Sequence, residues 1–125
     1  MGTIPTELGR LKKLKFIFFQ GNQISGHMPS EIGRLIKLEG LMLQQNFLDG
    51  AIPSEIGLCQ QLRRIDLTAN YMSGTLPKTF YDLVQLDTID LTKNKFQGTL
   101  SSAIGQLKML RFRKFNISFL CSCIS

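Results

Sequence analysis

The stretch Asn70-Tyr71-Met72-Ser73-Gly74-Thr75-Leu76-Pro77 decides the fold, because its frame returns along the chain at a fixed interval. The frame Asn-x-apolar-x-Gly-x-apolar-Pro also stands at 22–29 and at 46–53, and it returns at 94–101 with Ser101 in place of the proline. Each step is 24 residues long, with no insertion or deletion. A fixed period of about 20 to 50 residues is typical of solenoids, so the chain is predicted to be a stack of similar coils.

Apolar columns precede this frame in each full unit and predict a short strand. In the third full unit they are Leu62, Ile65 and Leu67, with the spacing Leu-x-x-Ile-x-Leu. The alternation at the end of this segment places its last two apolar residues on one face of a strand. Strands 24 residues apart leave room for the crossover that parallel pairing requires, so the strands are predicted to stack in parallel.

The residues after each strand are predicted to turn the chain and to join neighbouring coils. A buried asparagine offers two amide hydrogens and an acceptor oxygen, so it can hydrogen-bond the turn of its own coil and of the next. Glycine four residues later suits a tight bend, and proline fixes the backbone where a short helical or irregular return segment begins. The predicted asparagine ladder consists of Asn22, Asn46, Asn70 and Asn94.

The repeat resembles the plant-type leucine-rich repeat, and the resemblance covers essentially the whole chain. It rests on Leu62, Ile65, Leu67, Asn70, Met72, Gly74, Leu76 and Pro77, and on the closing signatures Ile32-Gly33-x-Leu35 and Ile104-Gly105-x-Leu107. The resemblance implies an α/β solenoid, a right-handed superhelix with a parallel β-sheet on its concave face and short helical or irregular segments on its convex side. Such repeats occur in the ectodomains of plant receptor-like kinases and receptor-like proteins, in secreted polygalacturonase inhibitors, and in algae such as diatoms.

A single leucine-rich-repeat array over residues 1–125 is the predicted domain organisation. Residues 1–13 read as the end of a preceding repeat, 14–37, 38–61, 62–85 and 86–109 as full repeats, and 110–125 as a degenerate truncated repeat. In this last unit Arg113 stands where an apolar residue is expected, Ser118 replaces the asparagine and Ser122 replaces the glycine. We therefore expect an excerpt from a longer array or a truncated product.

Composition narrows the class of protein. An apolar content of 43% and a charged content of 19% indicate a folded protein, and no apolar run approaches the length of a membrane span. The formal net charge is +6, with the positive residues concentrated near the two ends, but no nucleic-acid-binding motif accompanies them. Nucleic acid is therefore not an expected partner. The resemblance suggests a cell-surface or secreted protein, although the start of the chain lacks the layout of a signal peptide.

The candidate binding residues flank the strand leucines on the predicted concave face. Lys15, Glu39, Arg63, Asp87 and Arg111 form a column of alternating charge, which either supports the stacking of coils or contacts a partner. Phe16, Phe18 and Met42 form an apolar cluster on a face that is expected to be exposed to solvent. Such a cluster indicates either a binding partner or a preceding repeat that covers it. The candidate partner-binding residues are Lys15, Phe16, Phe18, Glu39, Met42, Arg63, Arg64, Asp66, Asp87 and Asp90.

No catalytic, metal or cofactor site is expected from the sequence. The carboxylates at Asp66, Asp87 and Asp90 recur because the repeat generates them, and His27 occupies an exposed position of the frame. Cys59 lies in a leucine column and is predicted to be a core residue. The pair Cys121 and Cys123 predicts outward-facing thiols, either free or linked to another chain, and Asn116 begins a glycosylation sequon.

Non-catalytic recognition of a peptide or protein ligand by the concave face is the predicted function. The resemblance favours a fragment of a receptor-like protein or receptor-kinase ectodomain in signalling or defence, with any kinase domain in a longer parent protein. A secreted inhibitor of a wall-degrading enzyme is an alternative. A basic surface that binds an anionic polymer or a membrane is a further alternative, and it predicts strongly salt-dependent binding.

Overall fold

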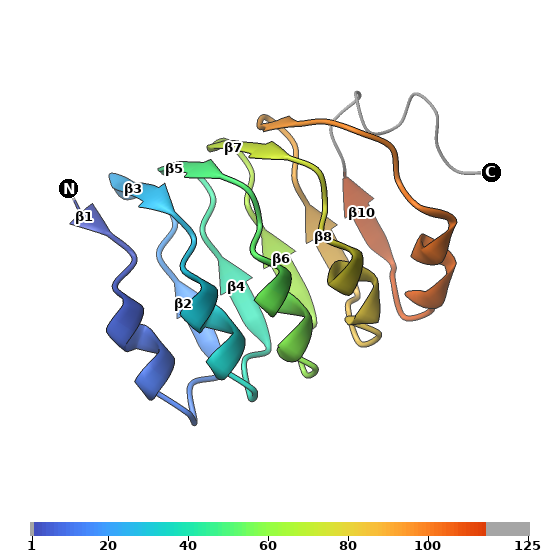
Figure 1. Ribbon diagram of the computed structural model, residues 1–125, viewed down its shortest axis with the longest axis horizontal. Helices are drawn as coiled ribbons and strands as arrows, with labels where there is room; N and C mark the ends of the chain where they lie inside the picture. The colour runs from blue at the N-terminus through green and yellow to red at the C-terminus, as the bar shows by residue number, and fades with distance from the viewer. Residues whose placement is uncertain (1, 115–125) are drawn as a thin grey trace.

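A computed structural model describes residues 2–114 of the chain, which form a stack of coils (Figure 1). Each complete coil contributes one strand to a main sheet, one strand to a second sheet and one short helix. Consecutive coils lie side by side from the N-terminal end of the stack to the C-terminal end. The predicted α/β solenoid is confirmed.

The main sheet is parallel and lines the concave face. Its strands are β2 (Phe16–Phe18), β4 (Gly40–Met42), β6 (Arg64–Asp66), β8 (Thr88–Asp90) and β10 (Phe112–Lys114), and each pairs with its neighbours in the chain order of the coils. The central residues of neighbouring strands are register partners, as in Ile17 with Leu41 and Ile65 with Ile89. Because these partners stand 24 residues apart, equivalent side chains of successive repeats form straight rows across the sheet.

A second parallel sheet was not predicted from the sequence. It contains β1 (Gly2–Thr3), β3 (Ile24–His27), β5 (Phe47–Gly50), β7 (Tyr71–Gly74) and β9 (Lys95–Phe96), in that spatial order. From β3 onward, these strands lie within or directly next to the asparagine-to-glycine part of the frame. Gly50 ends β5 with a φ of +74°, and a side chain there would run into the ring of His27. Glycine is therefore required where the chain leaves this sheet.

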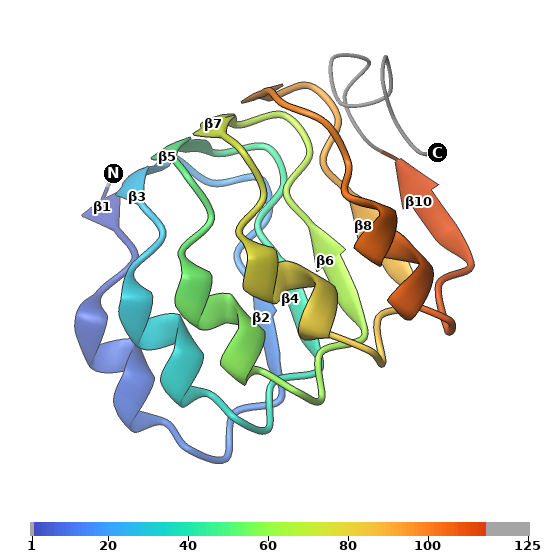
Figure 2. The same cartoon turned by 45° about the vertical axis from the view of Figure 1, so that its right-hand side comes forward.

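Short 3-10 helices cover the side of the stack opposite the main sheet (Figure 2). They are η1 (Thr6–Arg10), η2 (Ser30–Arg34), η3 (Ser54–Leu58), η4 (Lys78–Asp82) and η5 (Ser102–Gln106). A proline precedes each of the first four helices, with φ between −73° and −66°. Ser101 takes nearly the same conformation before η5, and its hydroxyl oxygen accepts a hydrogen bond from the Ala103 amide at 3.0 Å. The serine thus replaces the proline without altering the turn. None of the helices among residues 2–114 has the length and apolar character needed to cross a membrane.

The apolar columns of the sequence form one continuous core between the sheets and the helices. In the second full repeat Leu38, Leu41, Leu43 and Leu48 are all buried. Cys59 is also fully buried, and its thiol donates to the backbone oxygen of Ile32 in the preceding coil at 3.2 Å. A single coil has no apolar interior of its own, so burial of these side chains depends on the neighbouring coils.

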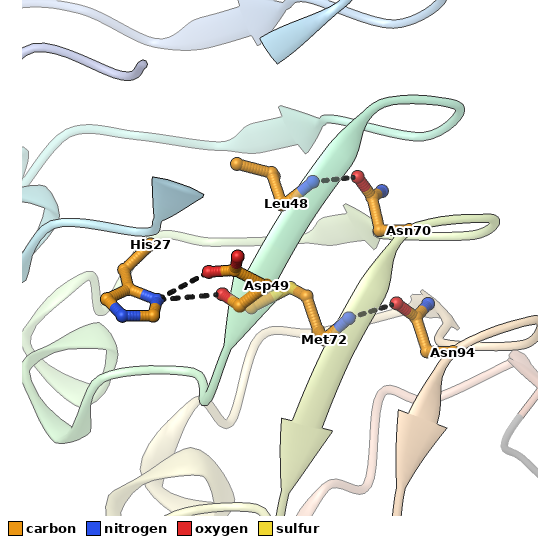
Figure 3. Close-up of polar contacts among 6 residues, drawn as sticks. All are labelled: His27, Leu48, Asp49, Asn70, Met72 and Asn94. Atoms are coloured by element: carbon orange, nitrogen blue, oxygen red, sulfur yellow. Dashed lines mark hydrogen bonds and ion pairs between the residues drawn. The ribbon is translucent and has the colours of Figure 1, made fainter. Parts of the chain in front are cut away.

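Asparagine side chains join each coil to the one before it. The Oδ1 atom of Asn70 accepts from the Leu48 amide at 3.0 Å, and its Nδ2 atom donates to the backbone oxygens of Leu43 at 2.9 Å and Leu67 at 3.0 Å. Asn94 makes the same contact with the Met72 amide at 2.9 Å, as Figure 3 shows for both asparagines. Asn46 repeats the pattern, with its Oδ1 atom on the Ile24 amide at 3.0 Å. These bonds satisfy buried backbone groups that water cannot reach.

Asn22 occupies the first position of this ladder, but its burial and its hydrogen bonds differ from those of the other asparagines. It is exposed, and its amide donates only to backbone oxygens of its own turn, those of Phe19 at 2.9 Å and Gln20 at 3.2 Å. Asn22 and Asn70 therefore share a place in the repeat but differ in burial and in bonds between coils.

Replacing Asn70 by alanine should lower the free energy of unfolding by about 3 kcal/mol, because a buried amide and two buried carbonyls lose their partner. Asn22→Ala is the matched control and should cost about 1 kcal/mol or less, because water can replace its bonds. Urea unfolding of the two variants measures the difference. Equal losses would contradict a bonding role between coils.

Candidate functional site

The side chains on either side of each buried strand residue form the exposed surface of the main sheet. Ile17 and Leu41 point into the core, with exposed fractions of 2% and 1%. Because side chains alternate along a strand, the residues before and after them face outward. The candidate binding residues of the sequence occupy these outward rows and the row just before each strand.

A shallow hollow of about 260 Å³ lies over the first strands of this surface. Most of the candidate residues meet in it, and Gly40 joins them; the lining consists of Phe16, Phe18, Glu39, Gly40, Met42, Arg63, Arg64 and Asp87. Lys15, Asp66 and Asp90 do not line it. Seven of the ten candidate residues therefore lie around one hollow of the exposed surface.

Two phenylalanines make one wall of the hollow. The rings of Phe16 and Phe18 stack with their centroids 5.7 Å apart and an interplanar angle of 8°. They remain 49% and 60% exposed, so their stacking hides only part of their apolar surface. Met42, half-buried, extends this wall onto the next strand. A contiguous exposed apolar surface of this kind on a folded protein is typical of a contact site.

Gly40 is the floor of the hollow, and sequence reasoning did not select it. Its strand partners are Phe16 on one side and Arg64 on the other. A Cβ atom at this position would lie 2.9 Å from Cδ1 of Phe16, so the ring rests against the glycine backbone. The sequence did contain a signal for this position, because a glycine within a strand segment often marks a place where another group comes close to the backbone.

The charges around the hollow balance one another. Arg63 and Arg64 contribute two positive charges, and Glu39 and Asp87 contribute two negative charges. The alternating column before the strands forms no ion pair between its own members, since the only ion pair among the described side chains joins His27 and Asp49. Backbone hydrogen bonds set the spacing of this column instead, such as Arg63 N to Glu39 O at 2.8 Å and Asp87 N to Arg63 O at 2.8 Å.

Asp66 and Asp90 hold the turns that follow their strands. Oδ1 of Asp66 accepts from the Thr68 amide at 3.0 Å. Oδ1 of Asp90 accepts from the Thr92 amide at 3.1 Å and from its hydroxyl at 2.7 Å. Local bonds of this type stabilise a turn. One oxygen of each carboxylate is therefore already engaged within the scaffold.

His27 lies on the second sheet, away from the hollow. Its Nδ1 atom is 2.7 Å from Oδ1 of Asp49 on the neighbouring strand, and both side chains are mainly exposed (Figure 3). Exposed pairs of this kind contribute little to stability. Within the described part of the chain, no group of three or more histidine, cysteine, aspartate or glutamate side chains could hold a metal ion.

Several sequence predictions fall outside the described residues. They concern the sequon at Asn116 and the thiols of Cys121 and Cys123.

The backbone of β10 does pair with β8, with Arg113 opposite Ile89. The main sheet thus continues into the unit whose sequence departs from the repeat.

The comparisons with known proteins agree with the repeat and its geometry. The model of the Leucine Rich Repeat family matches residues 13–35 and 85–107. The ectodomain of the plant membrane receptor kinase GASSHO1/SCHENGEN3 from Arabidopsis thaliana, solved with CASPARIAN STRIP INTEGRITY FACTOR 2, superposes on 92% of this chain with a TM-score of 0.88 and 39% identity. The chain is a plant-type leucine-rich-repeat protein. No curated protein matches it by sequence.

Other solved leucine-rich-repeat ectodomains are similar. The Arabidopsis receptor kinase HAESA, in complex with the peptide hormone IDA and the co-receptor SERK1, superposes on 92% of the chain with a TM-score of 0.88 and 29% identity. The receptor kinase SOBIR1 from Arabidopsis thaliana superposes on 91% with a TM-score of 0.85 and 32% identity. The chain spans 14% of the length of the GASSHO1 structure, 19% of HAESA and 62% of SOBIR1. It therefore corresponds to only part of each of these arrays.

Cys59 is the titratable group of this leucine-rich-repeat core that gives a pH prediction. Burial raises the pKa of its thiol from 9.0 to about 11. Between pH 9 and about pH 11, the thiol of the folded protein keeps its proton, whereas the thiol of the unfolded protein loses it. The stability from this group is complete below pH 9 and is lost as the pH rises toward 11.

Between these pH values the free energy of unfolding should fall by up to about 1.4 kcal/mol per pH unit more in the wild type than in Cys59→Ala. Urea unfolding of both proteins across this range measures the difference, and the other titrating groups cancel in the comparison. Parallel pH profiles would show that the thiol titrates in the folded state as it does in the unfolded state.

Proposed function

We propose that the concave face recognises a peptide or protein ligand without catalysing a reaction, and that the hollow above Gly40 is the centre of the contact. The observation that carries this proposal is the stacked, exposed pair Phe16 and Phe18 facing Arg64 across a glycine floor. Aromatic residues and arginine are the types that most often dominate the energy of protein interfaces.

The rigidity of the sheet supports the same proposal. The strands that carry Phe16, Gly40 and Arg64 are held in register by backbone hydrogen bonds and by the asparagine ladder. A surface held in this way loses little conformational entropy when a ligand binds. Because neighbouring strands lie about 4.8 Å apart, a ligand laid across them meets a new pair of side chains at every coil.

The similar ectodomains provide a biological context. GASSHO1/SCHENGEN3 was solved with CASPARIAN STRIP INTEGRITY FACTOR 2, and HAESA with the peptide hormone IDA and a co-receptor. By analogy, this chain is part of the ligand-binding array of a receptor-like protein in signalling or defence. A secreted inhibitor that binds a wall-degrading enzyme would use the same class of protein recognition. The lining of the hollow has no net charge, which disfavours an anionic polymer or membrane as its ligand.

Selection of displayed random peptides on the immobilised full chain tests the proposal. Selected peptides should lose affinity by at least about tenfold for the double variant Phe16→Ala/Phe18→Ala, because an aromatic anchor contributes more than 1 kcal/mol when buried by a partner. Affinities for the wild type and the variant are measured by titration calorimetry or biolayer interferometry.

A matched control lies on the second sheet. Phe47 and Tyr71 also stack, with centroids 6.1 Å apart and an interplanar angle of 10°, and are 47% and 50% exposed. The variant Phe47→Ala/Tyr71→Ala should bind the same peptides as the wild type does. Equal losses in both variants, or failure to select any peptide, would contradict recognition by the concave face. Salt-dependent binding of an anionic polymer by a chain that selects no peptide would instead support the anionic-polymer alternative.

A further inference from the structure

The two arginines of the hollow have different surroundings. The neighbours of Arg63 across the sheet are Glu39 and Asp87, to which its coil is joined by backbone hydrogen bonds at 2.8 Å. Its charge is therefore flanked on both sides by carboxylates of the same row. Arg63 is suited to balancing this row rather than to attracting a further negative charge.

Arg64 lacks such neighbours. Its strand partners are Gly40 on one side and Thr88 on the other, neither of which carries a charge. The nearest acid in its own strand is Asp66, one oxygen of which is engaged by the Thr68 amide. The Arg64 side chain is exposed and forms no ion pair or hydrogen bond with the described residues. Arg63 also forms no ion pair with the described residues, but only Arg64 has no carboxylate beside it in its own row, so Arg64 is the cation better placed to attract a carboxylate from a ligand.

The apolar wall and this cation are separated only by the glycine. Phe16 and Arg64 are the strand partners on either side of Gly40, so their backbones stand about two strand spacings apart, roughly 10 Å. Phe16 leans over the glycine, while no side chain rises from the glycine itself to divide the space. One ligand can therefore touch the phenylalanines and the guanidinium together.

We propose that the hollow selects an extended peptide that carries a large apolar side chain within two residues of an aspartate or glutamate. The apolar side chain packs over Gly40 against Phe16, Phe18 and Met42, and the carboxylate accepts hydrogen bonds from the guanidinium of Arg64. An extended peptide advances about 3.3 Å per residue, so one or two residues cover the step from the glycine strand to the arginine strand. This inference rests on the proposed function and adds the chemical class of the ligand.

Gly40 sets the apolar part of this specificity. Its backbone is not in the left-handed region, and the atom that a new Cβ would meet first belongs to the exposed ring of Phe16. That ring can rotate away, so a larger residue at position 40 is compatible with the strand. Gly40→Leu should fill the floor of the hollow while the protein remains folded.

The sequences of selected peptides provide the test. Random linear peptides are displayed with their C-termini fused to the carrier, so that every carboxylate in the library except the carrier's own belongs to a side chain. Selection on the wild-type chain should enrich a large apolar residue within two positions of an acid. Selection on Arg64→Glu should enrich the same apolar residue beside lysine or arginine. Selection on Gly40→Leu should keep the acid and lose the preference for a large apolar residue.

Affinity measurements on single selected peptides then give the size of each effect. Changing the selected acid to its amide, Asp to Asn or Glu to Gln, should weaken binding to the wild type about tenfold and leave binding to Arg64→Glu unchanged or stronger. Arg63→Glu is the matched control, because it changes an adjacent arginine of the same hollow. It should retain the preference for an acid that Arg64→Glu reverses. Thermal unfolding establishes that each variant is folded.

The outcomes separate this inference from the proposed function. Peptides that bind the hollow and are lost in Phe16→Ala/Phe18→Ala, yet show no acid preference, would overturn the ligand class and leave concave-face recognition intact. An acid preference that persists in Arg64→Glu would overturn the assignment to Arg64. If no peptide is selected, both the function and its ligand class are contradicted.

Discussion

Hydrogen bonds from the asparagine side chains are the constraint on which the rest of the solenoid depends. The Oδ1 atom of Asn70 holds an amide of the preceding coil, and its Nδ2 atom holds carbonyls of both coils. These bonds satisfy backbone groups that each turn would otherwise leave buried and unpaired. They also fix the position of each coil relative to the next, and this position aligns the exposed rows of the main sheet.

Alignment of the rows creates the hollow. Gly40 lies between Phe16 and Arg64 because residues 24 apart become strand partners. A missing side chain at one position of a regular array is therefore bounded on both sides by defined neighbours. The frame residues build the array, and we propose that the residues that vary between repeats contact the ligand. Asp66 and Asp90 belong partly to the frame, because each binds the turn after its own strand.

The fold could be predicted from the sequence because the features that determine it, namely the 24-residue period, the leucine columns and the repeated asparagine, are directly visible there. The second sheet could not, since three of its strands contain a glycine at positive φ and the spacing Asn-x-apolar-x-Gly has no clear strand signature. The aromatic cluster and the charged residues could be placed on one face from the repeat alone. The importance of Gly40 could not, because it depends on where the ring of Phe16 lies in the folded chain.

We propose that the asparagine frame supports the solenoid and that the exposed rows of the main sheet recognise the ligand. Backbone amide chemical shifts of the labelled chain, recorded while a selected peptide is added, test it most directly. We expect the largest changes in residues 16–18, 40–42 and 63–66, which surround the hollow. Largest changes in residues 47–50 and 71–74 of the second sheet would contradict it.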